Sequence, residues 1–343
     1  MSKIYEALRQ AELDRSKTDT AESDSESSRQ VTSQAVLEEA LGPTHIPAFS
    51  NTGRALAALP PVSRANGGKT SVAPPVDSRI ALAGAADEEL ELSDTDLARI
   101  PQVTWSPSLG QLPALEDRGS AVEQFRSLRS RMQEFRDLNA LKSILVSSGL
   151  PQEGKSFIAA NLAISFARHK AGRVLLIDGD MRRATVHKLL GCPQGPGLTE
   201  YLSGSASIVE VMQHPSPGKP DHPLPPGLAS LTIIPSGTEH DKAADLSGNR
   251  RFERLLKAAG PHFDWIVVDS SPVNLVSDGV NLARACDAVL LVARGGVTKY
   301  EIAQRALSEL KASKVLGFVL NAVKSPPIAG GYYGYDGYDK IEE

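Results

Sequence analysis

Apolar residues follow two different patterns along the chain. Six short runs are almost continuously apolar and rich in β-branched residues: SILVSS, RVLLID, LTIIPSG, WIVVDSS, AVLLVA and LGFVLNAV. The stretches between these runs are helical in character. Near-continuous apolar strands that alternate with helices are typical of a parallel sheet covered on both faces. The pattern therefore predicts an α/β, doubly wound, mostly parallel sheet.

The N-terminal part of the chain has a different character. Ile4, Tyr5 and Leu8 fall near one helical face, which predicts a short amphipathic helix, either a frayed end without a role or a helix that docks on a partner. From about Ser16 to Gln111 the sequence is rich in Ser, Thr, Asp and Glu and then in Pro, Gly and Ala, as in disordered linkers. We therefore expect a helix over residues 1–15, a disordered linker over 16–115, a folded domain over 116–325 and a tail over 326–343.

A helix from about Gly119 to Asp137 is predicted to open the domain, because apolar residues recur there at helical spacing. Ser120 stands three residues before Glu123, which is the spacing of a capping box. One face of this helix carries Glu123, Arg126 and Arg129. These three residues are either a contact surface or a capping glutamate followed by two solvated arginines.

Composition and charge narrow the function. The formal net charge is -4 and no Lys/Arg run is interleaved with aromatics, so no nucleic-acid partner is expected. Cys192 and Cys286 are far apart, which suits a reducing compartment and neither a disulfide framework nor a zinc site. No apolar run approaches the roughly 18 to 20 residues that span a bilayer. We therefore expect a cytoplasmic protein whose membrane association depends on a partner.

The strongest chemical signal follows the first predicted strand. GLPQEGKS, residues 149–156, matches the pattern G-x-x-x-x-G-K-S and leads into the helical stretch FIAANLAISFA. In such a P-loop, backbone N–H groups and the helix N-terminus surround phosphates, Lys155 reaches the β/γ oxygens and Ser156 ligates Mg²⁺. The sequence therefore predicts a P-loop NTPase fold that binds ATP and Mg²⁺.

Acidic residues end two more of the predicted strands. LLIDGDMRR places Asp178 and Asp180 at one strand end, and WIVVD places Asp269 at another. The carboxyl ends of parallel strands share one edge of the sheet, where ligands bind. Neighbouring carboxylates repel one another unless a cation or a proton separates them, so we expect Mg²⁺ there. The alternative for the Asp178 and Asp180 pair is one helix cap and one solvated carboxylate.

The chain ends in GYYGYDGYDKIEE, where glycines separate phenols that have nothing to pack against. This stretch holds four of the seven tyrosines, namely Tyr332, Tyr333, Tyr335 and Tyr338. A Gly/Tyr-rich end of low complexity is the alternative without a specific role. Beside an intact ATP site, we expect these tyrosines to be phosphoacceptors that the glycines keep accessible.

Taken in order, these motifs resemble the bacterial tyrosine autokinases (BY-kinases) of capsular and exopolysaccharide synthesis. The resemblance rests on the P-loop, LLIDGDMRR, GLTEYLSG, FDWIVVD, VLGFVLNAV and the tyrosine-rich tail, and it covers about residues 116 to 343. The opening MSKIYEALRQAE resembles the N-termini of some cytoplasmic members. The chain departs from the family pattern at three places. Ser271 stands where the usual D-x-P-P has its first proline, and Ala184 stands where a proline is usual. The stretch DKAADLS replaces the usual N-P-x-E-L-L.

The resemblance implies a role for each matching residue. Lys155 would bind phosphates, Ser156 and Asp269 would hold Mg²⁺ with support from Asp180, and Asp178 would accept the proton of the attacking tyrosine. The implied nucleotide contacts are Gly149, Gly154, Lys155, Ser156, Phe157 and Asn321, although an Asn that closes an edge strand is equally an ordinary turn residue. Glu123, Arg126 and Arg129 match the E-x-x-R-x-x-R spacing through which these kinases pair into rings.

The resemblance also implies partners: further copies of the chain in a ring, a separate membrane chain-length regulator that activates the kinase, and a protein-tyrosine phosphatase. The implied location is the cytoplasm, with recruitment to the inner face of the membrane. One alternative is a ParA/MinD-like ATPase switch, but that group carries a signature lysine where this chain has Leu150, and it has no use for the tail. The other is a non-catalytic nucleotide-binding scaffold, which the sequence does not separate from a kinase because binding ATP and using it need the same residues.

Overall fold

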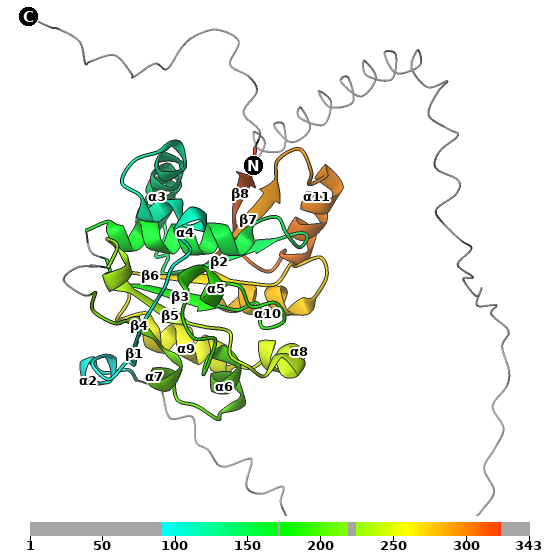
Figure 1. Ribbon diagram of the computed structural model, residues 1–343. Helices are drawn as coiled ribbons and strands as arrows, with labels where there is room; N and C mark the ends of the chain where they lie inside the picture. The colour runs from blue at the N-terminus through cyan, green and yellow to red at the C-terminus, as the bar shows by residue number, and fades with distance from the viewer. Residues whose placement is uncertain (1–90, 171, 219–223, 324–343) are drawn as a thin grey trace, which may run out of the picture. The chain divides into compact units, whose positions relative to one another are not determined.

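The computed structural model describes residues 91–170, 172–218 and 224–323, which form a parallel sheet covered by helices (Figure 1). This arrangement confirms the predicted α/β, doubly wound fold. The predicted helix over residues 1–15, most of the predicted linker and the tyrosine tail lie outside the described residues.

The six predicted strands form one sheet. Its order is β5 (Leu231–Ile234), β3 (Val174–Asp178), β6 (Trp265–Asp269), β2 (Ser143–Ser148), β7 (Ala288–Arg294) and β8 (Val315–Asn321). All neighbouring pairs are parallel. Every residue of β2, β3, β5 and β6 is buried, which explains why these strands are mostly apolar or small rather than alternating, up to the aspartates that end β3 and β6.

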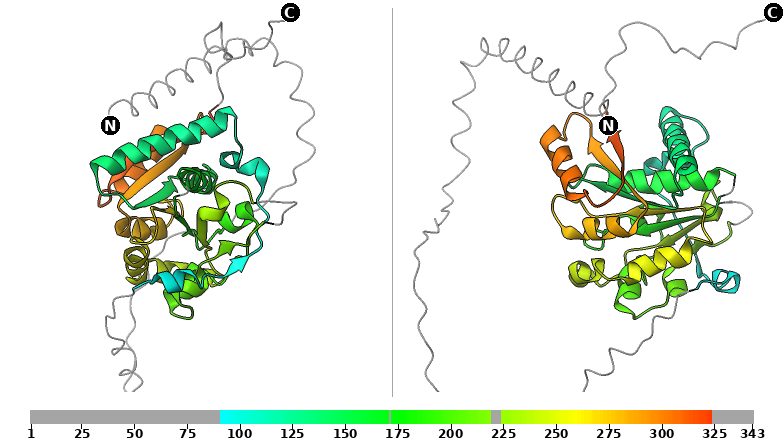
Figure 2. Two further views of the ribbon diagram at one scale, coloured as in Figure 1. Left: turned by 90° about the vertical axis from the view of Figure 1, so that its left-hand side faces the viewer. Right: turned by 180° about the vertical axis from the view of Figure 1, so that it is seen from behind.

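Successive strand residues enter two separate cores. On one face, Ile144 and Val146 pack with α3 (Ser120–Leu138), α4 (Lys155–Arg168) and α5 (Val186–Leu190). On the other face, Leu145 packs in a core that six helices complete (Figure 2). These are α6 (Leu198–Ser203), α7 (Ile208–Val211), α8 (Ala243–Ser247), α9 (Arg251–Ala259), α10 (Ser277–Ala285) and α11 (Tyr300–Glu309).

The helix α4 lies at the centre of the first core. All of its residues from Ile158 to Ala167 are buried, because the sheet covers one side and α3 covers another. A helix that is buried on several sides needs small and apolar residues around its circumference, as FIAANLAISFA provides. Within the described ranges, no helix combines the length and apolar character that crossing a membrane requires.

The folded domain begins earlier than the sequence predicts. Residues 91–115, assigned to the linker, form α2 (Asp94–Leu97), β1 (Gln102–Val103) and two short 3₁₀ turns, η1 (Leu109–Gln111) and η2 (Pro113–Leu115). The strand β1 pairs with β4 (His214–Pro215). Trp105, Leu112 and Leu115 are buried in the core beside α4. The predicted boundary at residue 116 is therefore wrong, since tertiary contacts order a segment whose own pattern is too short to indicate structure. Two further 3₁₀ turns are η3 (Leu228–Ser230) and η4 (His240–Lys242).

The predicted helix at Gly119 is confirmed, but its predicted capping box is wrong. The helix α3 begins at Ser120 with Gly119 as its N-cap, and no side chain caps it. Ser120 is already helical, so its hydroxyl is one position too late to act as the cap. Glu123 instead forms an ion pair with Arg126.

Candidate active site

The P-loop and the acidic strand ends meet at the carboxyl edge of the sheet. Residues 149–154 connect β2 to the N-terminus of α4. Asp178 ends β3 and Asp269 ends β6, and the two residues are in register on adjacent strands. Because β6 lies between β3 and β2, both strand ends open onto the P-loop.

A cavity of about 580 Å³ lies at this edge. Its polar lining includes Lys155, Ser156 and Asp180, and its apolar lining includes Phe157 and Leu275. The remaining lining residues are Pro151, Gln152, Gly154, Arg182, Arg183, Thr185, Leu189, Ser271, Pro272 and Val276. A polar floor beside an apolar wall suits a ligand with both phosphates and a ring.

Lys155 is the cation at the centre of this site. Its Nζ lies 2.7 Å from Asp180 Oδ2 and 3.6 Å from Asp269 Oδ1, and it donates to Ser156 Oγ at 3.2 Å. Burial by itself would lower the pKa of Lys155, but Asp269 and Asp180 outweigh it and raise the pKa. Lys155 is therefore a fixed positive charge at the mouth of the P-loop.

Asp269 is fully buried at the end of β6, and neither of its carboxylate oxygens accepts a well-formed hydrogen bond from the described part of the chain. Burial raises the pKa of Asp269 to about 6, although Lys155 opposes this shift. A buried carboxylate with free acceptor capacity is suited to a hard cation such as Mg²⁺. The hydroxyl of Ser156 lies on the same side of the P-loop, so the donor set fits the ion.

Asp178 is placed differently from Asp180. Its oxygens accept the backbone N–H of Thr185 at 3.2 Å, of Val186 at 3.1 Å and of Asp180 at 3.3 Å. Burial, followed by repulsion from Asp269, raises the pKa of Asp178 to about 8. Asp178 is fully buried and is absent from the cavity lining, whereas Asp180 lines the cavity and accepts from Ser271 Oγ at 3.1 Å.

Gly179 is required between the two aspartates. A Cβ at this position would lie 2.6 Å from the Asp269 carbonyl oxygen and 2.8 Å from Leu282 Cδ1. The Gly179 amide donates to that carbonyl at 2.8 Å. The absence of a side chain therefore brings the ends of β3 and β6 close together.

Comparisons with known proteins support one family. No protein-family model matches the chain. It is 33% identical over 207 residues to the tyrosine-protein kinase ptk of Acinetobacter johnsonii, covering 60% of this chain and 26% of that protein. It is 32% identical over 222 residues to the tyrosine-protein kinase YwqD of Bacillus subtilis, covering 64% of this chain and 89% of that protein. The chain belongs to the bacterial tyrosine-protein kinase family. It spans only about a quarter of the Acinetobacter relative.

Solved structures of this kinase family share the fold. The kinase domain of Escherichia coli tyrosine kinase ETK is 27% identical, with a TM-score of 0.58, over 72% of this chain and 93% of that structure. The BceF tyrosine kinase domain is 26% identical, with a TM-score of 0.52, over 68% of this chain and 99% of that structure. The family resemblance that the motifs indicate is thereby confirmed.

Asn321, an implied nucleotide contact in this kinase family, touches the P-loop directly. At the end of β8 its Nδ2 donates to the carbonyl of Glu153 at 3.0 Å. Gly154 has a φ of 95°, and a Cβ there would lie 2.0 Å from Asn321 Nδ2. The Asn321 side chain therefore holds the P-loop beside Gly154, where the backbone is left-handed. Gly149, at the other end of the loop, packs against Ile302 and Asn274.

The residues of the family's E-x-x-R-x-x-R pattern do not all face outward. Arg126 pairs with Glu123 and donates to the Asp117 carbonyl at 2.9 Å. Arg129 instead turns toward α4 and donates to the Ser165 carbonyl at 3.1 Å. The predicted contact role of these residues stays a prediction, and the predicted phosphoacceptors Tyr332, Tyr333, Tyr335 and Tyr338 lie outside the described residues.

Several residues of the site were not predicted from the sequence. Ser271 fixes Asp180, and Glu153 fixes the P-loop by accepting from the Leu150 amide at 2.8 Å and from the Thr298 hydroxyl. Arg182 donates to the buried Asp278 at 2.5 Å. The position of Ser271, just after a strand that ends in Asp, was an available signal. Thr298 and Asp278 carry no local signal, because they approach from other elements.

Proposed function

We propose that this chain is an ATP-dependent protein-tyrosine autokinase. It transfers the γ-phosphoryl group of ATP to the tyrosines of its own C-terminal tail, Tyr332, Tyr333, Tyr335 and Tyr338, and releases ADP. One observation carries the proposal: Lys155 of the P-loop meets Asp180 and Asp269 at the wall of the 580 Å³ cavity. The named relatives, which are tyrosine-protein kinases, support the choice of acceptor.

Catalysis of this transfer depends on position and charge. The phenolic oxygen forms a bond to the γ-phosphorus, the bond from that phosphorus to the β–γ bridging oxygen breaks, and ADP leaves with the electron pair. Lys155 contacts the phosphate oxygens as their negative charge shifts. Gly149, Gly154, Ser156 and Phe157 surround the nucleotide, and Asn321 supports the loop from the end of β8.

Ser156 and Asp269, with Asp180 beside them, are the residues that would hold Mg²⁺ together with the phosphates. The free oxygens of the buried Asp269 are the structural reason for this assignment. When bound, Mg²⁺ neutralises charge on the phosphate oxygens. Such sites hold the ion through one or two carboxylates and the phosphates of the nucleotide.

Asp178 is proposed as the group that takes the phenolic proton. Its raised pKa suits a proton acceptor that works near neutral pH. The Thr185 and Val186 amides now occupy one of its oxygens, so the loop before α5 must shift for a phenol to reach it. Catalytic hydrogen bonds often form only once the substrate is bound.

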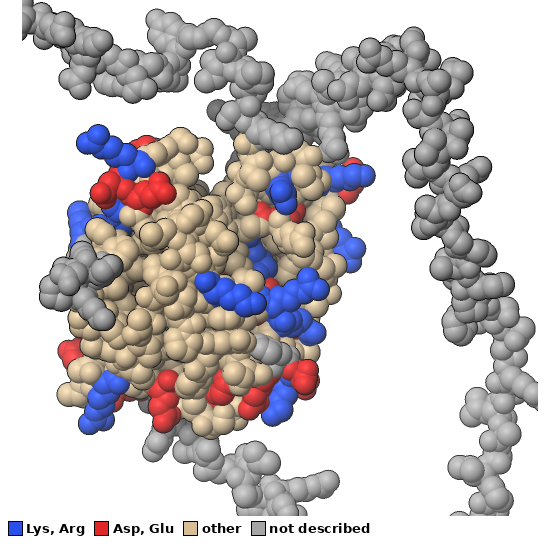
Figure 3. Space-filling model, viewed as in Figure 1, with Lys and Arg blue, Asp and Glu red and all other residues tan. Residues whose placement is uncertain are grey.

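The tail is a suitable substrate in charge as well as in chemistry. It contains Asp336, Asp339, Glu342 and Glu343 beside its tyrosines. On the face in Figure 3, Lys and Arg side chains gather across the middle, whereas Asp and Glu side chains gather along the lower edge. Arg182 and Arg183 line the cavity itself. An acidic tail is therefore attracted toward the site that modifies it.

We further propose that the kinase works as part of a larger system. Copies of the chain assemble into a ring through Glu123, Arg126 and Arg129, and each tail is phosphorylated by a neighbour. A separate membrane chain-length regulator recruits the cytoplasmic kinase to the inner face of the membrane and activates it. A protein-tyrosine phosphatase removes the phosphoryl groups. This cycle of phosphorylation and dephosphorylation regulates exopolysaccharide or capsule synthesis and export. The proposed activation would be contradicted if the isolated chain were fully active and co-expression of a regulator did not change that activity.

Intact-mass spectrometry tests the proposed activity. Purified protein is first treated with a phosphatase and is then incubated with ATP and Mg²⁺, with ATP and EDTA, or with ADP and Mg²⁺. Mass increases of one or more phosphoryl groups, which map to the tail, are expected only with ATP and Mg²⁺. Hydrolysis of ATP without any gain in mass would instead identify a nucleotide switch, and neither reaction would indicate a scaffold.

A further inference from the structure

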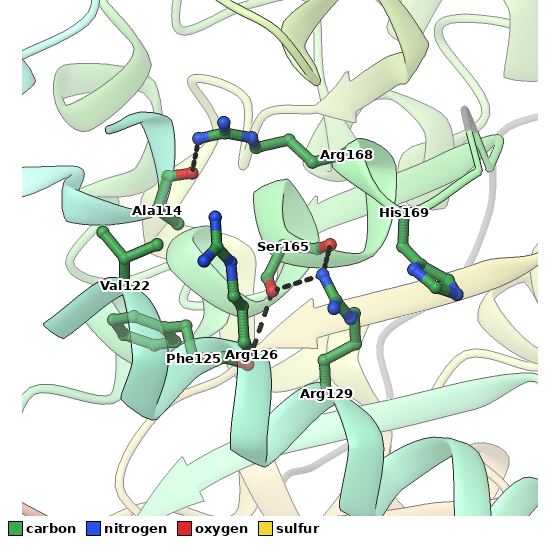
Figure 4. A pocket seen from close by; sticks show the side chains of 8 residues that line it. All are labelled: Ala114, Val122, Phe125, Arg126, Arg129, Ser165, Arg168 and His169. Atoms are coloured by element: carbon green, nitrogen blue, oxygen red, sulfur yellow. Dashed lines mark hydrogen bonds between the residues drawn. The ribbon is translucent and has the colours of Figure 1, made fainter. Parts of the chain in front are cut away.

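A second cavity lies between α3 and α4, away from the P-loop residues. Its volume is about 230 Å³ (Figure 4). One side is apolar and consists of Ala114, Val122 and Phe125. The other side consists of Arg126, Arg129, Ser165, Arg168 and His169. In the close-up view of Figure 4, Arg129 reaches Ser165, and Arg168 extends toward Ala114. The cavity therefore combines a hydrophobic wall with a strongly basic one.

The basic side of the cavity carries more positive charges than the nearby carboxylates neutralise. Arg126 pairs with the exposed Glu123, and Arg168 pairs at 2.7 Å with the exposed Asp117. Within the described ranges Arg129 forms no ion pair, and its buried Nε has no hydrogen-bond partner. Burial and the nearby charges of Arg126 and Arg168 lower the pKa of Arg129. An anion in this space would relieve the repulsion among the three guanidinium groups.

We propose that this cavity binds an aryl phosphate, namely a phosphotyrosine side chain of the phosphorylated tail. A phosphate monoester carries close to two negative charges at neutral pH and three strong acceptor oxygens, which suit several guanidinium groups at once. The aromatic ring of the phosphotyrosine would lie against Val122 and Phe125. A free phosphate or a phosphoserine has no ring to make this contact. The proposal rests on the proposed kinase function for the source of the phosphotyrosine.

Binding at this cavity has a consequence for assembly. Arg126 and Arg129 are also the residues that the proposed ring uses for contact between copies of the chain. A phosphotyrosine on these guanidinium groups and a neighbouring subunit would compete for the same side chains. The product of the reaction then weakens the assembly that makes it, which provides feedback without any additional protein.

The test measures binding of a synthetic peptide, so that it does not depend on kinase activity. The peptide GYYGYDGYDKIEE, labelled with a fluorophore and phosphorylated at the position of Tyr335, is titrated with the full chain in which all four tail tyrosines are changed to Phe. Fluorescence anisotropy reports the affinity. We expect Arg129→Gln and Arg126→Gln each to weaken binding about tenfold or more, the effect of losing a charge-assisted contact. Arg131→Gln, an exposed arginine of α3 outside the cavity, should change it less than about twofold.

Three controls locate the site and identify its ligand. Lys155→Met should leave the affinity unchanged, which separates this cavity from the active site. Phenyl phosphate should displace the peptide at lower concentration than inorganic phosphate, and the unphosphorylated peptide should bind at least about tenfold more weakly. Thermal unfolding of each variant checks its fold; Arg168→Gln is secondary because Arg168 also supports the Ala114 carbonyl at 2.8 Å.

Several results would overturn the proposal. One is that the Arg129→Gln and Arg126→Gln variants bind the phosphopeptide as tightly as the parent chain does. The others are that the unphosphorylated peptide binds as tightly as the phosphopeptide, or that inorganic phosphate competes as well as phenyl phosphate. Binding of vesicles that contain anionic lipid through these arginines, without binding of the phosphopeptide, would assign the cavity to a membrane instead. If the chain fails to phosphorylate itself but binds the peptide as described, the kinase proposal fails and the site remains.

Discussion

Lys155 and the carboxylates around it form a buried group of closely spaced charges. Lys155 contacts Asp180 and Asp269, and neither partner is exposed to solvent to any useful extent. Charges with so little access to water interact strongly, because the surroundings screen them weakly. A nucleotide phosphate that enters the P-loop therefore competes with Asp180 and Asp269 for the same ammonium group.

We predict that Lys155→Met lowers tail phosphorylation by about 10³-fold or more, because the variant loses the fixed cation that contacts the transferring phosphoryl group. Quantitative phosphotyrosine blotting after incubation with Mg²⁺ and ATP measures the effect. The matched control is Lys311→Met, at an exposed lysine, which should retain activity. Undiminished labelling of the Lys155→Met variant would remove Lys155 from the mechanism.

Asp178 provides a second prediction. Asp178→Asn should reduce phosphorylation about 10²-fold or more, since general-base catalysis contributes on that scale. Nucleotide affinity, measured with a fluorescent ATP analogue, should change little because Asp178 does not line the cavity. If affinity and activity fall together, Asp178 acts by holding the Thr185 and Val186 amides and not as a base. Asp241→Asn, at an exposed residue, is the control.

Whole elements of the structure are joined by single polar side chains. Asn321 ties β8 to the P-loop, and Glu200 ties α6 to the loop after β5. Glu200 accepts from the Gly197 amide at 2.8 Å, from the Thr238 amide at 2.8 Å and from the Thr238 hydroxyl at 2.6 Å. The GLTEYLSG segment therefore holds this loop through a carboxylate rather than through apolar packing alone.

The pH dependence of stability tests this link. Burial alone would raise the pKa of Glu200, but the hydrogen bonds from Thr238 and Gly197 outweigh burial and lower the pKa. Because the folded pKa lies below the unfolded value of about 4.3, the stabilisation is fully present above that pH and is lost as the pH falls through the folded pKa.

We therefore predict that Glu200→Gln lowers the urea midpoint of unfolding at pH 7, and that the difference from the parent shrinks as the pH falls below about 4.3. Glu253→Gln, at an exposed residue of α9, is the matched control. A difference that stays constant from pH 7 to pH 3 would show that the carboxylate charge of Glu200 does not contribute.

The parallel sheet places the end of β8 and the P-loop at the same edge of the domain. All six strands point the same way, so β8 ends on the same edge as β2, β3 and β6. The chain leaves β8 close to the P-loop, as the contact of Asn321 with Glu153 shows. About nine residues separate Val323 from Tyr332, a reach of at most about 30 Å. This length can serve the chain's own site or that of a neighbour.

For the ring, we predict that replacing Glu123, Arg126 and Arg129 together by Ala lowers both the oligomer mass and the phosphorylation. Light scattering measures the mass on protein first shown to be oligomeric. Arg131→Ala on the same helix is the control. An unchanged mass would leave these residues with only their contacts inside the domain, namely the pair of Glu123 with Arg126 and the bond of Arg129 to Ser165.

Transfer between subunits is tested by mixing two chains, neither of which can phosphorylate its own tail. One carries Lys155→Met with an intact tail, and the other has an intact active site with all four tail tyrosines changed to Phe. We expect phosphotyrosine on the Lys155→Met chain, because the two prolines of SPPIAGG stiffen the exit from β8 and hinder a turn back to the chain's own site. Absence of this signal, with both variants folded and co-assembled, would contradict transfer in trans.

The sequence by itself determined the features that depend on local pattern. Six continuously apolar runs became the six strands, because a strand buried on both faces must be apolar or small at nearly every position. The G-x-x-x-x-G-K-S spacing and the strand-terminal aspartates placed Lys155, Asp178 and Asp269 at one edge, because parallel strands share their carboxyl ends. Each of these inferences needs only neighbouring residues and the direction of a strand.

The tertiary structure decided the features that depend on residues distant in the sequence. It buried residues such as Trp105 and Leu112, which a reading of composition assigned to a linker, and it turned Arg129 toward α4. It also gave different surroundings to two aspartates that are only two positions apart. Asp178 accepts hydrogen bonds from backbone amides, whereas Asp180 pairs with Lys155. The physical reason is that burial, ion pairing and pKa depend on which elements pack together, and strand order and helix packing are not recorded in any local pattern.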